Sequence, residues 1–228
     1  MQIHAWACRL PFLAAVAVLS SCASVSVKNV DRGSASKPQQ KPAHFYVAPF
    51  SIAKAELREN TMLRQAKAKG QLGPEVQQLL SKYLVSELSK NLGPASAVKP
   101  GAAPKSGGWL IGGEVTRVNE GNRLLRMGIG LGAGGTKMET KVAVRNLPAS
   151  NPPFLNFATT GGSNATPGAA TNPIPFSSAP TALLQSTQGV TDDAARTARM
   201  ITATIADYMV QRGWLAAGAV QKPKMASQ

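Results

Sequence analysis

The sequence is poor in the residues from which most catalytic and metal sites are built. Its 228 residues include two cysteines, two histidines and eleven acidic residues. His4 and Cys8 lie in the first 21 residues, which we expect to be removed as a secretion signal, so His44 would be the only mature histidine. A serine–histidine triad or a multi-histidine zinc site on one chain would have to use His44. We therefore expect no metal, no cofactor and no enzymatic activity.

The chain near its N-terminus also lacks an apolar run long enough to cross a membrane. The segment Leu10–Leu19 spans about ten residues, whereas a transmembrane helix needs roughly twenty. Arg9 precedes it, and Leu19-Ser20-Ser21-Cys22 closes it. A basic leader, a short apolar segment and small residues before a cysteine are typical of a bacterial lipoprotein signal. Residues 1–21 are predicted to be the signal peptide and Cys22 the lipidated residue. Ordinary secretion with cleavage after Ala23 is the alternative.

Lipidation at Cys22 would anchor the protein to a bilayer. One acyl chain holds marginally and two or more hold stably, and bacterial lipoproteins of this type carry two or three. Residues 22–42 are rich in Ser, Lys, Gln and Pro without apolar periodicity, which predicts a flexible tether. Residue 23 is Ala rather than Asp, which in Gram-negative lipoproteins generally goes with the outer membrane. We expect an outer-membrane anchor with the domain facing the periplasm.

Acidic residues are far outnumbered by basic ones, and the formal net charge is +14, or +13 once Arg9 has left with the signal. The basic residues are scattered and the chain is expected to leave the cytoplasm, so no nucleic-acid partner is predicted. A positive field of this size favours anionic partners such as lipid head groups, lipopolysaccharide or cell-wall polymer. A basic, solvated surface without such a role is the alternative.

Two segments have the spacing of amphipathic helices. The first begins near Pro74, ends at Gly93, and repeats apolar residues at intervals of three and four, namely Val76, Leu79, Leu80, Tyr83, Leu84, Leu88 and Leu92. The second begins with a cap at Thr191, Asp192 and Asp193, runs to Gly213, and has the stripe Ala198, Ile201, Ile205, Tyr208 and Met209. Both stripes are predicted to face the core.

Between the two helices the period changes to two. Met138, Thr140, Val142 and Val144 alternate with polar residues, as in a strand with one buried face. Further strands are predicted over 44–50, 108–118 and 155–159. The order β-α-β-β-β-α predicts an α+β fold with two layers, in which two main helices pack on a single mixed sheet of about four strands.

The predicted periplasmic domain spans 43–215 and is interrupted by segments without such periodicity. Residues 54–71, with Leu57, Met62 and Leu63, are expected to form a surface helix or arm, and 93–107 a linker. Residues 161–190 are rich in Gly, Ser, Thr, Ala and Pro and are predicted to be a disordered low-complexity loop. Residues 216–228 are predicted to be a flexible tail.

Glycine is concentrated in residues 120–135. Gly130, Gly132 and Gly135 satisfy a G-x-G-x-x-G pattern, but a strand rather than a helix follows, so a dinucleotide site is not expected. A tight connection between two central strands is the preferred interpretation. Binding of a phosphate or carboxylate by Arg123 and Arg126, close helix packing, and contact with a bilayer surface remain alternatives.

The Gly-x-Arg-x-x-Arg element at 121–126, the glycines of 128–134 and the alternating strand that follows resemble the bacterial lipoproteins grouped as domain of unknown function 4410. The likeness covers most of residues 44–160. That family carries no established activity, so the resemblance implies location and fold. It also implies signature positions of unknown role, which are Gly121, Arg123, Arg126, Gly130, Gly132 and Gly134.

These features favour a non-enzymatic, membrane-anchored envelope lipoprotein whose periplasmic domain binds another envelope component, either an anionic polymer or a protein. The alternative is a subunit of an oligomeric envelope assembly or export complex; the sequence does not indicate the oligomeric state. A weaker alternative is a cell-wall or lipid hydrolase that uses a carboxylate pair such as Glu114 and Glu120.

Overall fold

The structure is a computed structural model of the chain, and it describes residues 23–33, 37–59, 70–100, 102, 106–121, 135–163 and 179–220. The elements in this part of the chain are seven strands and two helices. In order they are β1 (Ala23–Asp31), β2 (Phe45–Val47), β3 (Glu56–Arg58), α2 (Leu72–Asn91), β4 (Ala95–Ala97), β5 (Trp109–Asn119), β6 (Lys137–Asn146), β7 (Leu155–Ser163) and α4 (Ala179–Gln211).

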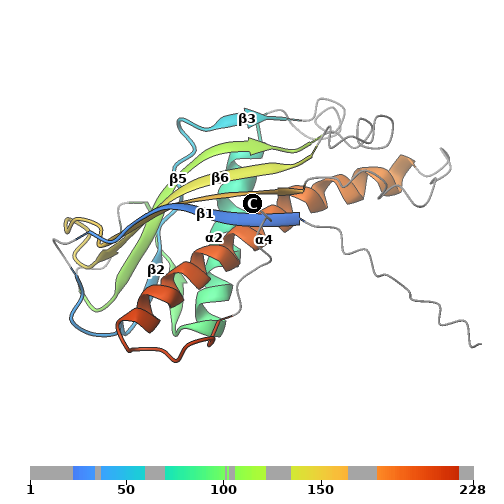
Figure 1. Cartoon of the computed structure of the whole chain (residues 1–228). Helices are drawn as coiled ribbons and strands as arrows, with labels where there is room; N and C mark the ends of the chain where they lie inside the picture. The colour runs from blue at the N-terminus through green and yellow to red at the C-terminus, as the bar shows by residue number, and fades with distance from the viewer. Residues whose placement is uncertain are drawn as a thin grey trace, which may run out of the picture.

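All the described strands belong to one mixed sheet in the order β1-β7-β6-β5-β2-β4, with β3 paired to the same edge of β5 as β2 (Figure 1). Neighbours from β1 to β5 are antiparallel, whereas β2, β3 and β4 pair in parallel. The predicted α+β class, the single mixed sheet and the two main helices are confirmed. The predicted number of about four strands is wrong, because the described sheet has seven.

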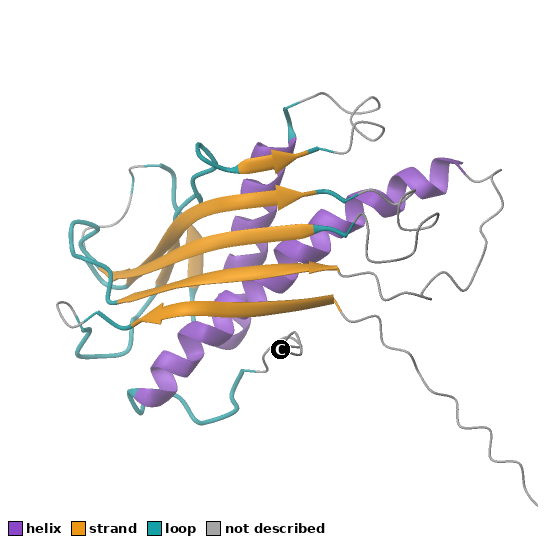
Figure 2. Ribbon diagram, turned by 45° about the horizontal axis from the view of Figure 1, so that its top comes forward, coloured by secondary structure: helices purple, strands orange, loops and turns teal. Residues whose placement is uncertain are grey.

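Both helices cover the same face of the sheet (Figure 2). Helix α4 packs on β1, β6 and β7, α2 packs on β2 and β4, and the helices contact each other. The predicted stripes face the core. Leu80, Leu84, Ile201 and Ile205 are fully inaccessible to solvent, and Leu79 and Tyr83 are partly buried against it. Helix α2 ends close to Gly93, as predicted, where Leu92 donates its N–H to the Leu88 carbonyl. Burial of these stripes against the sheet stabilises both helices more than intrinsic helix propensity does.

The alternation predicted for β6 is confirmed. Its Met138, Thr140, Val142 and Val144 are buried beneath the helices. The hydroxyl groups of Thr140 and Thr159 are hydrogen bonded at 2.7 Å, so these two buried polar groups on β6 and β7 satisfy each other.

Strand β1 overturns the prediction of a flexible tether over 22–42. From Ala23 its backbone pairs with β7, and Val25 is 1% exposed. The segment Ser24-Val25-Ser26-Val27-Lys28 has the period-two alternation of a half-buried strand, but so short a polar run is hard to distinguish from a linker. The described fold therefore includes residues 23–31, which lie before the predicted domain start at residue 43.

The predicted limits of the low-complexity loop are also wrong. Residues 161–163 complete β7, and 179–190 form the first turns of α4, while 164–178 lie outside the described residues. The predicted helix start at Thr191 falls inside α4, where Asp193 is only 2% exposed and contacts Arg196 at 3.2 Å. Pro180 stands in the first turn of α4, where its missing N–H costs nothing.

Two other segments contain short strands that were not predicted. Residues 56–58 form β3 within the expected surface helix of 54–71, and 95–97 form β4 within the expected linker. Three-residue strands leave no periodic signal in the sequence. Met62 and Leu63 lie outside the described residues. In the expected flexible tail, Val220 packs partly buried against the core, and 221–228 are not described.

No described helix is both long enough and apolar enough to span a bilayer.

Candidate functional site

The second face of the sheet carries no helix in the described part of the chain, and we call it the open face (Figure 2). Side chains of a strand alternate between faces, so the residues between the buried positions of β6 point to this face. They include Lys137, Glu139, Lys141, Ala143 and Arg145. The open face is therefore polar and carries charge of both signs.

The register sets these side chains in rows across neighbouring strands. One row runs from Lys28 on β1 through Ala158 and Lys141 to Glu114 on β5. The next contains Asn156, Ala143 and Gly112. The small residues Ala158 and Ala143 thus lie within the two rows, with longer polar side chains around them.

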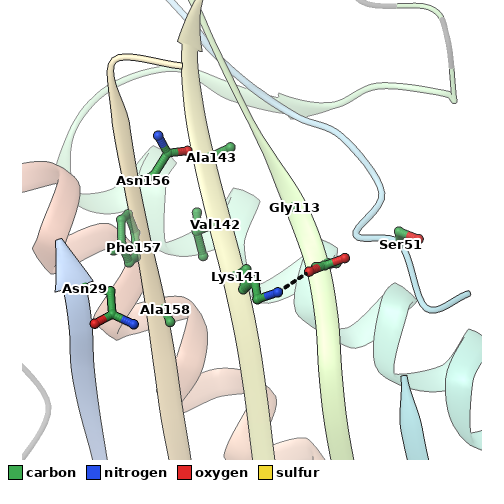
Figure 3. Close-up of a pocket in the computed structure, with 10 residues that line it drawn as sticks. Asn29, Ser51, Gly113, Lys141, Val142, Ala143, Asn156, Phe157 and Ala158 are labelled. Carbon is green, nitrogen blue, oxygen red and sulfur yellow. Dashed lines mark ion pairs between the residues drawn. The ribbon is translucent and has the colours of Figure 1, made fainter. Parts of the chain in front are cut away.

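A hollow of about 440 Å³ lies over these small residues (Figure 3), and we call it the open-face groove. Four strands and the segment that follows β2 contribute to it. Its polar and small side chains are Asn29, Ser51, Glu114, Lys141, Ala143, Asn156 and Ala158.

An ion pair crosses the groove. Lys141 Nζ lies 2.9 Å from Glu114 Oε1, and the side chains are 68% and 35% exposed (Figure 3). The hydrogen bond from Lys141 lowers the pKa of the Glu114 carboxyl, its positive charge acts in the same direction, and Lys54 adds a smaller attraction. So exposed a pair contributes little to stability. Its effect is to hold a carboxylate and an ammonium group at known positions in the groove.

A second ion-pair cluster lies beside the groove, where β3 meets β5. Glu56 accepts hydrogen bonds from Arg58 at 2.7 Å and from Arg117 at 2.8 Å, one on each carboxylate oxygen. The bonds from Arg58 and Arg117, in that order, lower the pKa of the Glu56 carboxyl. Both guanidinium groups are thereby held at this end of the open face by one carboxylate.

Gly113 lines one side of the groove and contributes no side chain to it. A Cβ atom at Gly113, built on a φ of 158°, would collide with the carbonyl oxygen of Lys141 on β6. The adjacent strands can approach in this way only because residue 113 has no side chain.

The groove offers several hydrogen-bond donors. Asn29, Asn156 and Ser51 supply amide and hydroxyl groups, and Lys141 supplies an ammonium group. Lys28 does not line the groove but lies beside it, because it pairs with Ala158 on β7. Such groups suit a carboxylate, phosphate or polyhydroxylated ligand. No cluster of three metal-ligating side chains occurs in the described residues.

The candidate catalytic carboxylates are not brought together. Glu114 lies on the open face, whereas Glu120 is buried beyond the end of β5, 8% exposed. A register shift between Val115 and Arg117 changes the alternation of β5 between them. Six residues of strand separate the two carboxylates by roughly 20 Å, well beyond the 5–9.5 Å that glycoside hydrolysis uses. His44 lies away from both, with Nε2 2.9 Å from Ser96 Oγ and its ring against Tyr46.

Of the predicted site residues, only Gly121 is described. It has φ 73° and donates its N–H to the side-chain oxygen of Asn119 at 3.0 Å, so it turns the chain as it leaves β5. Asn119 and Lys137 pair directly, so the glycine-rich stretch does connect two neighbouring central strands, as predicted. The remaining predicted positions, which are Cys22, Arg123, Arg126, Gly130, Gly132 and Gly134, lie outside the described residues.

The sequence analysis missed the groove itself. Its alternating polar positions were visible in β6, but Lys28 and Asn29 stood in the expected tether and Ser51 in a connection. No local signal relates these positions to one another, because the strand register alone brings them together.

Comparison with known proteins gives one family match. The family model described as "Domain of unknown function (DUF4410)" matches residues 45–204. No curated protein matches the chain.

Among solved structures, the PelC dodecamer from Paraburkholderia phytofirmans is similar with a TM-score of 0.36 and 7% identity, over 76% of this chain and 94% of that chain. A leucine-to-methionine variant of that protein gives a TM-score of 0.32 and 8% identity, over 76% and 95%. Similarity at this level supports no conclusion about how this chain assembles or what it binds.

Proposed function

We propose, from the premise that this chain belongs to the family of the domain of unknown function 4410, that it is a lipid-anchored envelope protein without catalytic activity. Acyl chains on Cys22 would hold it at a membrane, which Ala23 suggests is the outer membrane of a Gram-negative cell. Its domain, in the periplasm, would bind an anionic, polyhydroxylated polymer of the cell wall through the open-face groove.

The observation that supports this proposal is the groove. Its lining combines the Lys141 ammonium group and several amide and hydroxyl groups with the small side chains of Ala143 and Ala158. Lys28 is exposed and has no acidic partner in the described residues, whereas Lys141 is paired with Glu114. An unpaired ammonium group is available to a ligand's carboxylate or phosphate without first breaking an ion pair. The positive charge of the whole chain adds long-range attraction for such a polymer.

Anchoring is tested by cell fractionation and mass spectrometry. The native protein is expected in the membrane fraction with Cys22 acylated, and Cys22→Ala in the soluble fraction. A free thiol at Cys22 in the mature protein, or a Cys22→Ala protein that stays with the membranes, would refute the lipid anchor.

Binding is tested by co-sedimentation of the Cys22→Ala protein with purified peptidoglycan sacculi. We expect Lys28→Ala to weaken binding by roughly tenfold, since a hydrogen bond to a charged group contributes about 1.5–3 kcal/mol. Lys82→Ala is the matched control, because Lys82 lies exposed on α2, on the covered side of the sheet. Equal binding by all three proteins, or no binding by any, would refute the groove as a polymer site.

The second candidate, a subunit of an envelope assembly, is favoured by one observation. The outer edge of β1 has no strand beside it in the described residues, and such an edge can pair with another chain. Light scattering on the purified Cys22→Ala protein separates the two candidates: a stable oligomer favours the assembly, and a monomer favours the solitary binding module.

A further inference from the structure

The position at which β1 begins has a consequence for how the domain meets the membrane. Ala23 pairs with Ser163, so regular backbone pairing starts one residue after Cys22. An acyl group on Cys22 would therefore be attached almost directly to the corner of a sheet. This inference rests on the proposed lipid anchor. Because β1 starts at Ala23, there is no room for a tether between the lipid and the sheet.

The register shows which residues share that end of the sheet. Ser24 pairs with Gly162, Gly162 with Lys137, Lys137 with Asn119, and Asn119 with Arg58. We call these five positions the anchor row. At about 4.8 Å between strands the row spans roughly 19 Å. Cys22 precedes Ser24 by two residues, so the chain allows it to be at most about 7 Å from the row.

We propose that the anchor row is the membrane-facing end of the domain and that its partner is the head-group layer of a phospholipid bilayer. The strands then run away from the bilayer surface. Lys141, four residues along β6 from Lys137, stands roughly 13 Å above the row, which keeps the open-face groove outside the head groups. The first turns of α4 project past the strands on the same side (Figures 1 and 2) and meet the bilayer there as well.

Charge does not create this orientation. Lys137 is paired with Glu139 at 2.7 Å, and Arg58 shares the Glu56 carboxylate with Arg117, so little net positive charge remains on the described side chains of the row. The acyl chains and the stiffness of β1 position the row, and we expect the orientation to persist at high salt and in vesicles without anionic lipid. A flexible tether, by contrast, would leave the domain free to rotate.

The test uses the acylated full chain in vesicles of phosphatidylethanolamine and phosphatidylglycerol that contain nitroxide-labelled head groups. Cys8 leaves with the signal and acylation blocks Cys22, so an introduced cysteine is the only free thiol. Lys137→Cys and Arg145→Cys are matched positions on the same face of β6, roughly 27 Å apart. A fluorophore at residue 137 should lose most of its emission, and one at residue 145 should lose none.

A second variant tests the missing tether. About twelve Gly and Ser residues inserted after Ala23 reach roughly 19 Å and should abolish the difference between the two labels while the protein stays membrane-bound. Equal quenching in the uninserted protein, or stronger quenching at residue 145, would overturn the orientation alone. Recovery of unacylated protein in the soluble fraction would instead overturn the lipid anchor and, with it, this inference.

Discussion

At Gly113 the sheet leaves no room for a side chain, because a Cβ atom would meet the backbone carbonyl of Lys141. We expect Gly113→Ala to lower the free energy of unfolding by about 3 kcal/mol, as overpacking against backbone does. Urea denaturation measures the change. In the control, Gly70→Ala, φ is also positive but nothing lies within 4 Å, so the loss should be about 1 kcal/mol. Equal losses would mean that the strands do not approach as described.

Two threonines of α4 offer a contrast in hydrogen bonding. Thr202 is buried and its hydroxyl has no partner among the described residues, whereas Thr204 donates its hydroxyl to the Met200 carbonyl at 2.8 Å. Thr202→Val should raise the free energy of unfolding by about 1 kcal/mol, since it removes an unsatisfied buried group. Thr204→Val should lower it or leave it unchanged. Thermal denaturation checks both, and the opposite order would contradict the assignment.

Among the individual elements, β1 can be tested as a strand rather than a tether by substitution of two of its valines, one buried and one exposed. Val25 is 1% exposed and Val30 is 39% exposed. We expect Val25→Asp to cost roughly 3 kcal/mol, because it buries a charge in the core, and Val30→Asp to cost almost nothing. A flexible tether would make both substitutions neutral in urea denaturation.

We expect the contribution of the Glu56 cluster, which joins β3 to β5, to depend on pH. The pKa of Glu56 is lowered from 4.5 by the arginines, so the folded state binds this proton less readily than the unfolded state. The ionised Glu56 carboxylate and its two arginines stabilise the folded state fully above about pH 4.5. This contribution is lost as the pH falls through the lowered pKa that Glu56 has in the folded state. As the pH falls from about 5 to 3, the Glu56→Gln protein should therefore lose less of its free energy of unfolding than the native protein does.

Urea titrations at stepped pH measure this difference between the native protein and Glu56→Gln. The side chains are 39–67% exposed, so about 1 M NaCl should reduce the difference by screening. Identical pH profiles at low salt would show that the cluster does not contribute.

At the scale of the whole molecule, α2, α4 and the sheet share one hydrophobic core. Leu80 of α2 and Ile201 of α4 are both fully buried in it. Leu80→Ala and Ile201→Ala should each cost about 2–5 kcal/mol and shift one common unfolding transition. The fluorescence of buried Trp109 and the far-UV circular dichroism should change together. Two separate transitions would show that the helices unfold independently.

In the proposed arrangement both helices cover one face of the sheet, the other face binds the polymer, and the end of the sheet at which β1 begins meets the membrane. The anchor row and the groove lie at different heights along the same strands. In the proposed arrangement the same nine-residue strand bears the anchor at one end and contributes Asn29 to the groove near the other.

The sequence by itself determined the two long helices, the alternation of β6 and the family. Leu84 and Ile205 could be assigned to the core because helical periodicity is a local property, repeated over many turns. The pattern at 121–126 on which the family resemblance was based is likewise local. The lipid site at Cys22 rests on the same kind of pattern and stays a prediction.

Only the tertiary structure decided that residues 23–31 are a strand, that β1 lies beside β7, and that Lys28, Lys141 and Glu114 form one row. The physical reason is that the pairing of β1 with β7 joins residues more than a hundred positions apart, and its register is selected by burial on one face of the sheet. From its sequence alone the segment Ser24–Lys28 cannot be distinguished from a tether. It forms a strand because β7 and α4 provide the surface against which its valines pack.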